Sequence, residues 1–405
     1  RNLHSKVKEK HYPAPYALVD IWEKYGYDEF KFMKAEAESV SKLAVTDTAK
    51  NLLRVFMLQD ILKGEGNKSK LDLKHVHVVG AGTMGSDIAM WAALSGYKVT
   101  LQDIDEATIA KGMARSYKFY KKRFSNQEHL INEVYDRLIP DSGGLGISSA
   151  DVVIEAIIEN VDIKRNLYSK LESEMKSTAI LATNTSSIKL EVLSAEMQNP
   201  ERLVGIHFFN PVAKMPLIEV IYSPVTSTEV IEKSLAFCRH IDKLPLKVKS
   251  SPGFLVNRVL MPTLIEAINM LDEGCLKEEI DASFTDFGMP MGPLKLADTV
   301  GLDVCYFVMD TICEELGLKI PERLERLVEN GNLGVKSGVG FYIHDVYAEK
   351  THGNPKLEIT SRLVKVMIDE CEKCLSEGIV ESADLIDAGI IFGTGFAPFR
   401  GGPIH

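Results

Sequence analysis

The chain has 405 residues, of which 45% are hydrophobic and 26% are charged, and its formal net charge is −10. This is the composition of a globular protein, and the length suggests about two to three domains. The negative charge argues against general nucleic-acid binding, and no apolar run is long enough to cross a bilayer.

Residues 1–70 are expected to form a helical connecting segment. Their apolar spacing predicts helices over 16–25, 27–43 and 48–62, with Asp47 as the N-cap of the third. The expected apolar face of that helix comprises Leu52, Leu53, Phe56 and Leu58. The chain starts with arginine and has no signal-peptide pattern, so we expect it to be a piece of a longer protein.

A glycine-rich turn follows a short β-branched run over 75–79. The sequence Gly-Ala-Gly-Thr-Met-Gly occupies 80–85, and a helix is expected over 86–94. The first glycine allows a tight turn, the second lets the backbone approach a pyrophosphate, and the third lets the helix pack on the sheet. The helix N-terminus then offers free N–H groups to the phosphates. The cofactor-binding residues expected here are Gly80, Gly82, Thr83 and Gly85.

An acid follows at the spacing that a dinucleotide site needs. A second strand, expected over 98–103, ends in Asp103, eighteen positions after Gly85. A carboxylate about 20 positions after the glycines binds the adenosine ribose hydroxyls. No arginine follows at once to accept a 2′-phosphate, so the pattern favours NAD over NADP.

Strands and helices alternate over 71–250. Candidate strands lie at 75–79, 98–103, 151–156, 179–183, 203–207 and 217–222, and helices are expected at 105–124 and 162–175. This alternation predicts the α/β class, with parallel strands and crossover helices in a doubly wound, Rossmann-type sheet. The ligand crevice of such a sheet lies at the carboxyl ends of its strands.

Two residues in this part are candidates for acid–base chemistry. His207 ends a candidate strand, so it is expected at the crevice, and Glu219 lies inside the apolar stretch 216–220. A buried carboxylate needs a partner, and a histidine suits because the pair orients the ring and stabilises the imidazolium. The alternative is a structural histidine and an edge-strand acid that faces water.

Further polar residues are expected near the same crevice. Asn184 to Ser187 follow the strand over 179–183, although a hydroxyl-rich turn that caps the next helix would have the same composition. Asn257 lies early in the first helix after the break at Ser251-Pro252-Gly253. Its amide is either a core hydrogen-bonding group or a ligand contact that reaches across an interdomain cleft.

From 251 the pattern is all-helical, with one domain expected over 251–345 and a truncated second repeat over 346–405. Helices are expected at 255–273, 298–316, 362–377 and 383–392. An exposed apolar face on the helix at 255–273 is compatible with a homodimer. Cys371 and Cys374 form C-x-x-C within a helical pattern, and no second pair lies at zinc spacing, so we expect no metal site.

Several of these stretches occur together in a specific order. They are the glycine turn at 80–85, Asn184-Thr185-Ser186-Ser187, His207-Phe208-Phe209-Asn210-Pro211, Glu219 and Pro252-Gly253-Phe254-x-x-Asn257-Arg258. In this order the stretch from about 72 to 345 resembles the L-3-hydroxyacyl-CoA dehydrogenase family. Residues 11–63 resemble the segment that follows the enoyl-CoA hydratase domain in multifunctional fatty acid oxidation enzymes, and 355–403 resemble their second C-terminal dehydrogenase repeat. The resemblance therefore implies the dehydrogenase part of such an enzyme, without its hydratase domain.

The resemblance implies a role for each matched residue. His207 would take the proton of the 3-hydroxyl group with Glu219 as its orienter, while Ser186 and Asn257 would hold the substrate oxygen. The positions that match NAD contacts are Met84, Asp103, Glu159, Lys164, Asn184, Ser186 and Asn210. Ser116 and Lys122 fall near the positions that bind coenzyme A, with a spacing that differs by one residue.

The implied function is the NAD-dependent oxidation of an L-3-hydroxyacyl-CoA to a 3-oxoacyl-CoA in fatty acid β-oxidation. Two alternatives stay open: a dehydrogenase of free 3-hydroxy acids, which typically recruits a lysine base, and a non-catalytic, crystallin-like NAD-binding relative. The complete set of His207, Glu219, Ser186 and Asn257 argues against the second. A bacterial cytoplasmic enzyme is expected, with a mitochondrial or peroxisomal one as the alternative, and the partner would be a second copy or a thiolase subunit.

Overall fold

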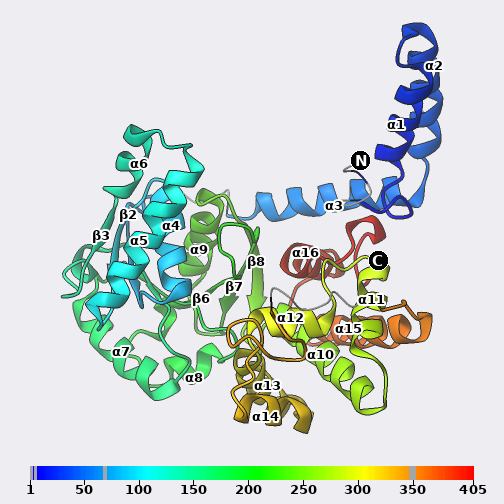
Figure 1. Ribbon diagram of the computed structural model, residues 1–405. Helices are drawn as coiled ribbons and strands as arrows, with labels where there is room; N and C mark the ends of the chain where they lie inside the picture. The colour runs from blue at the N-terminus through cyan, green and yellow to red at the C-terminus, as the bar shows by residue number, and fades with distance from the viewer. Residues whose placement is uncertain (1–2, 4–6, 67–70, 346–352) are drawn as a thin grey trace.

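The computed structural model describes residues 3, 7–66, 71–345 and 353–405. In chain order these residues form a helical arm, a sheet region and a helical region (Figure 1). The arm consists of α1 (Ala14–Tyr25), α2 (Glu29–Leu43) and α3 (Asp47–Gly64). Helices α1 and α2 project away from the rest of the molecule, and α3 extends from their base past α16 to the sheet region (Figure 1).

The N-terminus of α3 corrects one expectation. Thr46, not Asp47, is the N-cap: its side chain accepts the Ala49 N–H, and Asp47 is the first helical residue. The predicted apolar face is wrong at Leu53 and Phe56, which are exposed, whereas Leu58 is buried as expected and Leu52 is half-buried. Helix α3 packs against β8, α16 and η3 (Pro398–Arg400), so the face that these elements cover is the buried one.

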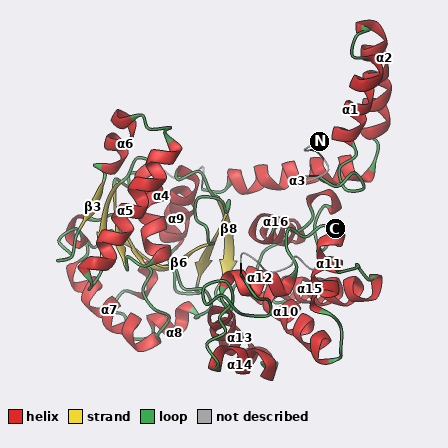
Figure 2. Cartoon of the chain, in the orientation of Figure 1, coloured by secondary structure: helices red, strands yellow, loops and turns green. Residues whose placement is uncertain are grey.

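One eight-stranded sheet has the order β3-β2-β1-β4-β5-β6-β7-β8. Its strands are drawn in yellow in Figure 2, with helices around them. The strands are β1 (His75–Val79), β2 (Lys98–Gln102), β3 (Leu138–Pro140), β4 (Val152–Glu155), β5 (Ile180–Thr183), β6 (Leu203–Phe208), β7 (Leu217–Tyr222) and β8 (Leu244–Lys249). The six predicted strands are present, and β3 and β8 are additional. The expected α/β class, with a Rossmann-type sheet followed by a helical region, is confirmed.

One pair of strands departs from the expected parallel pattern. Strands β6 and β7 are antiparallel, whereas the other neighbours run parallel. Only residues 209–216 join them, and a parallel connection needs about a dozen residues or more. The antiparallel register places His207 directly opposite Glu219.

Helices cover the sheet and form the remainder of the molecule. Those of the sheet region are α4 (Thr83–Leu94), α5 (Glu106–Arg123), α6 (Glu128–Tyr135), α7 (Val161–Glu174), α8 (Leu190–Ser194) and α9 (Thr228–His240). Those that follow are α10 (Val256–Asp272), α11 (Lys277–Phe287), α12 (Pro293–Val300), α13 (Leu302–Leu316), α14 (Glu322–Glu329), α15 (Leu357–Ser376) and α16 (Ala383–Thr394). The helix predicted over 298–316 is interrupted at Gly301, whose φ is 109°. Among the described residues, no helix is long and apolar enough to cross a membrane.

Candidate active site

The three glycines of the turn between β1 and α4 have different surroundings. Gly80 has a φ of 101°, and a Cβ on Gly85 would lie 1.8 Å from the Gly80 carbonyl oxygen. Gly82 is the N-cap of α4, and a Cβ there would meet no atom within 4 Å. The fold itself therefore requires Gly80 and Gly85, whereas the space beside Gly82 is open. This open space lies at the N-terminus of α4, whose first turn holds Thr83 and Met84. The free N–H groups of that turn favour an anion.

Asp103 lies beside this turn, at the end of β2. Its Oδ2 accepts the Ala81 N–H at 2.6 Å, and its Oδ1 accepts the Asp105 N–H at 3.1 Å. Arg115 on α5 also holds the turn, since its guanidinium donates to the Thr83 carbonyl oxygen at 2.9 Å. No sequence motif marks Arg115, because it reaches the turn from the middle of another helix.

His207 and Glu219 form a buried pair at the end of β6. His207 Nδ1 lies 2.7 Å from Glu219 Oε2, and the two residues are 4% and 0% exposed. Because a carboxylate accepts hydrogen bonds, the contact places a proton on Nδ1 and leaves the Nε2 lone pair of a neutral ring free. The rings of Phe209 and Phe254 lie 4.6 and 5.7 Å from the imidazole, centroid to centroid.

A strained turn supplies the other partners of Glu219. Gly253 and Phe254 both adopt positive φ, 70° and 55°, and this conformation is unfavourable for a bulky residue such as phenylalanine. The turn directs the N–H groups of Leu255 and Val256, at the start of α10, to Glu219 Oε1, each at 3.0 Å. A helix N-terminus thus stabilises the carboxylate that faces His207.

Asn257, on α10, contacts Ser186 in the loop after β5. Asn257 Nδ2 donates to the Ser186 carbonyl oxygen at 3.0 Å, and the Ser186 N–H donates to Glu159 Oε1 at 2.7 Å. Asn184 is buried, and its Oδ1 accepts the Phe208 N–H at 2.9 Å, which ties the loop after β5 to the end of β6. Asn210 is exposed and precedes a cis peptide bond to Pro211.

A buried polar cluster lies beneath this loop, and sequence patterns identify only part of it. Glu155, the last residue of β4, accepts hydrogen bonds from Lys164 Nζ at 2.6 Å and the Ile157 N–H at 2.8 Å. Its other oxygen accepts from the Tyr168 hydroxyl at 2.7 Å and the Thr183 hydroxyl at 2.8 Å. Lys164 is 1% exposed, so its ammonium lies inside the protein between carboxylates rather than on the surface of the crevice.

The two residues that match coenzyme A positions have different surroundings. Ser116 is buried and its hydroxyl donates to the Gly112 carbonyl oxygen of its own helix, at 2.9 Å. Lys122 is exposed near the end of α5. The Ser116 hydroxyl is therefore turned into the protein, whereas the Lys122 side chain faces solvent.

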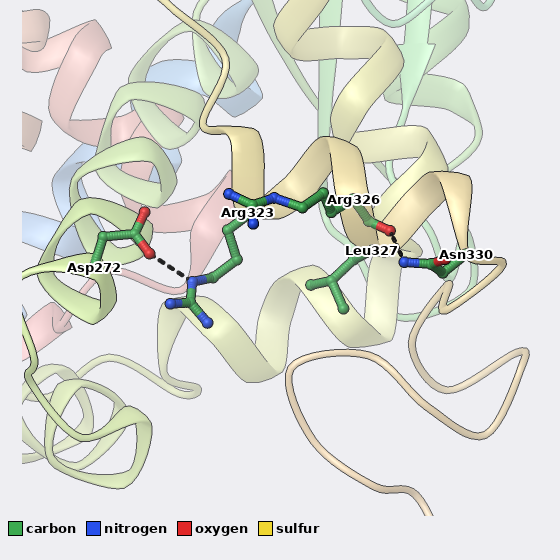
Figure 3. Close-up of a pocket in the computed structure, with 5 residues that line it drawn as sticks. All are labelled: Asp272, Arg323, Arg326, Leu327 and Asn330. Carbon is green, nitrogen blue, oxygen red and sulfur yellow. Dashed lines mark hydrogen bonds and ion pairs between the residues drawn. The ribbon is translucent and has the colours of Figure 1, made fainter.

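A surface cavity of about 230 Å³ lies apart from these residues (Figure 3). It is lined by Asp272, Arg323, Arg326, Leu327 and Asn330, none of which is a predicted site residue. Both of its arginines already have carboxylate partners, Arg323 with Asp272 at 2.7 Å and Arg326 with Glu322 at 3.0 Å. The crevice at the ends of β1, β4, β5 and β6 is therefore the better candidate for the active site.

Two family models match consecutive parts of the chain. Residues 75–251 match the family model described as 3-hydroxyacyl-CoA dehydrogenase, NAD binding domain, and residues 253–344 match the model described as 3-hydroxyacyl-CoA dehydrogenase, C-terminal domain. The chain belongs to the 3-hydroxyacyl-CoA dehydrogenase family. As the sequence predicts, this 3-hydroxyacyl-CoA dehydrogenase is an NAD-dependent enzyme.

Solved structures of this family are similar over most of the chain. A 3-hydroxybutyryl-CoA dehydrogenase from Escherichia coli is 27% identical, with a TM-score of 0.76 over 82% of this chain and 91% of that one. An (S)-3-hydroxybutyryl-CoA dehydrogenase from Ralstonia eutropha is 35% identical, with a TM-score of 0.64 over 68% and 100%. The dehydrogenase part of multifunctional enzyme 1 from C. elegans is 27% identical, with a TM-score of 0.59 over 88% and 89%.

The residues of this dehydrogenase fit the cofactor that its family binds. The open space at Gly82 suits the close approach of a pyrophosphate. Glu159 Oε2 is buried and forms an ion pair with Lys164 at 3.3 Å, but has no hydrogen-bond partner among the described residues. An acceptor without a donor, at the ends of strands that border the crevice, is suited to a hydroxyl group of a bound dinucleotide.

Proposed function

We propose that this chain oxidises L-3-hydroxyacyl-CoA to 3-oxoacyl-CoA with His207 as the general base. The observation that carries the proposal is the 2.7 Å contact between His207 Nδ1 and Glu219 at the carboxyl end of β6. Such a contact fixes the tautomer whose Nε2 can accept a proton, and it stabilises the imidazolium that results. Family membership supports the substrate class and the cofactor.

In the proposed mechanism NAD, when bound, supplies the hydride acceptor, and the chain handles the proton. His207 Nε2 takes the proton of the 3-hydroxyl group, while Glu219 and the two N–H groups behind it hold the imidazolium in place. Asn257 Nδ2 has two N–H groups and uses one for Ser186, so the other can hold the substrate oxygen. Preorganised donors of this kind stabilise the charge that develops on that oxygen.

The biological setting that we propose is fatty acid β-oxidation, within a protein that also carries an enoyl-CoA hydratase. The similarity to the dehydrogenase part of a multifunctional enzyme supports this setting. A bacterial cytoplasmic location and association with a second copy or a thiolase subunit stay predictions, as does the division of the chain at 70, 250 and 345.

The first experiment measures NADH formation from a 3-hydroxyacyl-CoA by His207→Gln and Glu219→Gln. We expect kcat to fall about 10²- to 10⁴-fold for His207→Gln, the usual contribution of a general base, with a smaller fall for Glu219→Gln. The dissociation constant of NAD should change little, because neither side chain belongs to the glycine turn.

The matched control is His129→Gln, since His129 is exposed on α6 and should leave kcat unchanged. Equal rates for His207→Gln and the unchanged chain would remove His207 from the mechanism. Turnover of a free 3-hydroxy acid, with none of its CoA ester, would instead favour the dehydrogenase of free acids.

A further inference from the structure

Three charged groups lie together in the cluster beneath the loop after β5. Lys164 Nζ is 2.6 Å from Glu155 Oε1 and 3.3 Å from Glu159 Oε2. Four donors surround Glu155, which is the environment of an ionised carboxylate that accepts on both oxygens. Two carboxylates thus share one ammonium, and the trio of Glu155, Lys164 and Glu159 carries a net charge of about −1.

The other members of the cluster do not offset this charge. Thr183 contributes a neutral hydroxyl. Burial, together with the Glu155 charge, raises the pKa of Tyr168 well above its usual value, so Tyr168 stays a neutral donor. The side chains of Glu155 and Lys164 are 0% and 1% exposed, so water screens their charges weakly.

The sheet topology places the trio on the path of the cofactor. Glu155 ends β4 and pairs in register with Thr183, the last residue of β5. The strand order puts β4 and β5 between β1, which leads into the glycine turn, and β6, which carries His207. A dinucleotide with its pyrophosphate at Gly82 and its reactive ring near His207 must cross the ends of these two strands.

We propose that Glu155, through Lys164 and Glu159, gives this part of the crevice a net negative charge that favours NAD over NADH. The nicotinamide ring is cationic in NAD and neutral in NADH, so a fixed negative charge stabilises the oxidised form selectively. Glu155 is a positioning residue in this scheme, because it acts through its neighbours. The inference rests on the NAD site of the proposed function, but it concerns binding and is independent of the role of His207.

The test compares the dissociation constants of the two dinucleotides for the full chain at one pH and ionic strength. NADH is titrated by its fluorescence, and NAD by competition with bound NADH. Glu155→Gln keeps the side-chain shape and removes one charge. We expect the ratio of the NAD constant to the NADH constant to rise about tenfold, equivalent to about 1.4 kcal/mol.

Tyr168→Phe is the matched control, because it removes a hydrogen bond from the same carboxylate without a change of charge. Its ratio should equal that of the unchanged chain. Should Glu155→Gln fail to fold, Glu159→Gln removes the same charge from a side chain that is 24% exposed and keeps an oxygen for the Ser186 N–H. Its ratio is also expected to rise.

Two results would overturn the proposal. One is an equal loss of affinity for both dinucleotides in the variants that lack a carboxylate, and the other is a shift of the ratio in Tyr168→Phe as large as theirs. Either would mean that the cluster supports the loop without an electrostatic preference. Since no turnover is measured, this result is readable whether or not His207 proves to be the base.

Discussion

At the scale of single residues, two glycines of the turn between β1 and α4 are needed for different reasons, one for packing and one for space beside the backbone. A Cβ at position 85 would collide with the Gly80 carbonyl oxygen at 1.8 Å, whereas a Cβ at position 82 would enter open space. Gly82 also has a φ of −60°, which any residue can adopt. We infer that Gly85 serves the fold, and that Gly82 keeps space for the dinucleotide.

These two positions give a paired prediction. Gly82→Ala should retain the thermal stability of the chain and weaken NAD binding, by about tenfold or more, because a methyl group occupies the space that the pyrophosphate needs. Gly85→Ala should lower the melting temperature, because helix α4 must move away from β1. Calorimetry and NADH fluorescence titration measure the two effects. A Gly82→Ala chain that binds both dinucleotides as tightly as before would place the pyrophosphate elsewhere.

The sequence indicates some residues of the site more readily than others. The glycines, Asp103 and His207 follow strands with recognisable spacing, so their common location at the crevice could be predicted. Glu155 ends an apolar strand too, but its partners Lys164 and Thr183 come from α7 and β5, and no spacing rule connects them. The left-handed conformation of Phe254 has no sequence signal, although it directs two N–H groups to Glu219.

At the scale of elements, β1 brings two histidines into the interior of the sheet region. His77 Nε2 contacts Gln102 Oε1 at 2.9 Å, and this oxygen can only accept, so the neutral ring accepts at Nδ1 from the Thr100 hydroxyl at 2.7 Å. The Thr100 oxygen in turn lies 2.9 Å from His75 Nε2. The hydrogen bond that His77 accepts at Nδ1 requires its ring to be neutral, and burial lowers the pKa of both His77 and His75.

The pH dependence of stability should follow from these histidines. The unfolded chain takes up protons on both rings below pH about 6.5, and the folded chain resists them, so stability is constant above that value and is lost as pH falls. His77→Gln should reduce the loss between pH 7 and 5.5 by about 1 kcal/mol. Urea unfolding at the two pH values measures it. The exposed His129→Gln chain is the control, and an unchanged pH slope in His77→Gln would show that the ring already protonates in the fold.

The sequence predicts whether a stretch is a helix or a strand better than it predicts which elements lie next to each other. Long stretches with regular apolar spacing, such as α10 and α15, could be located from the sequence. The short strand β3 and the break at Gly301 could not, because three residues or one backbone angle leave no periodic signal. The antiparallel step from β6 to β7 follows from the short link at 209–216, which the alternation of strands and helices alone does not indicate.

At the scale of the whole molecule, α15 and α16 pack against α10, the helix that carries Asn257. One apolar core contains residues from α3, β7, α10, α15 and α16. The helical arm, the sheet region and the helices on both sides of residue 345 are therefore packed together. Arg258, next to Asn257 on α10, is 3% exposed and donates to Glu370 at 2.8 Å. Its other nitrogens form two bonds of 2.7 Å with Glu377, just after α15.

Removal of this arginine should therefore affect both stability and catalysis. Arg258→Met leaves Glu370 buried without its ion-pair partner on α10, and the expected loss is about 3–5 kcal/mol of unfolding free energy.

The double change Arg258→Met with Glu370→Met should regain part of this free energy, because the buried charge is then absent. Lys247→Met is the control: Lys247 pairs with Glu381 at 2.8 Å, but the two side chains are 34% and 64% exposed, so the loss should stay below about 1 kcal/mol. Urea unfolding measures all three. At a temperature where each variant is folded, kcat should fall in the two variants that lack Arg258 and not in Lys247→Met, because the same turn of α10 carries Asn257 and the N–H groups that hold Glu219. Equal small losses in Arg258→Met and Lys247→Met would mean that the C-terminal helices are not needed to hold the start of α10.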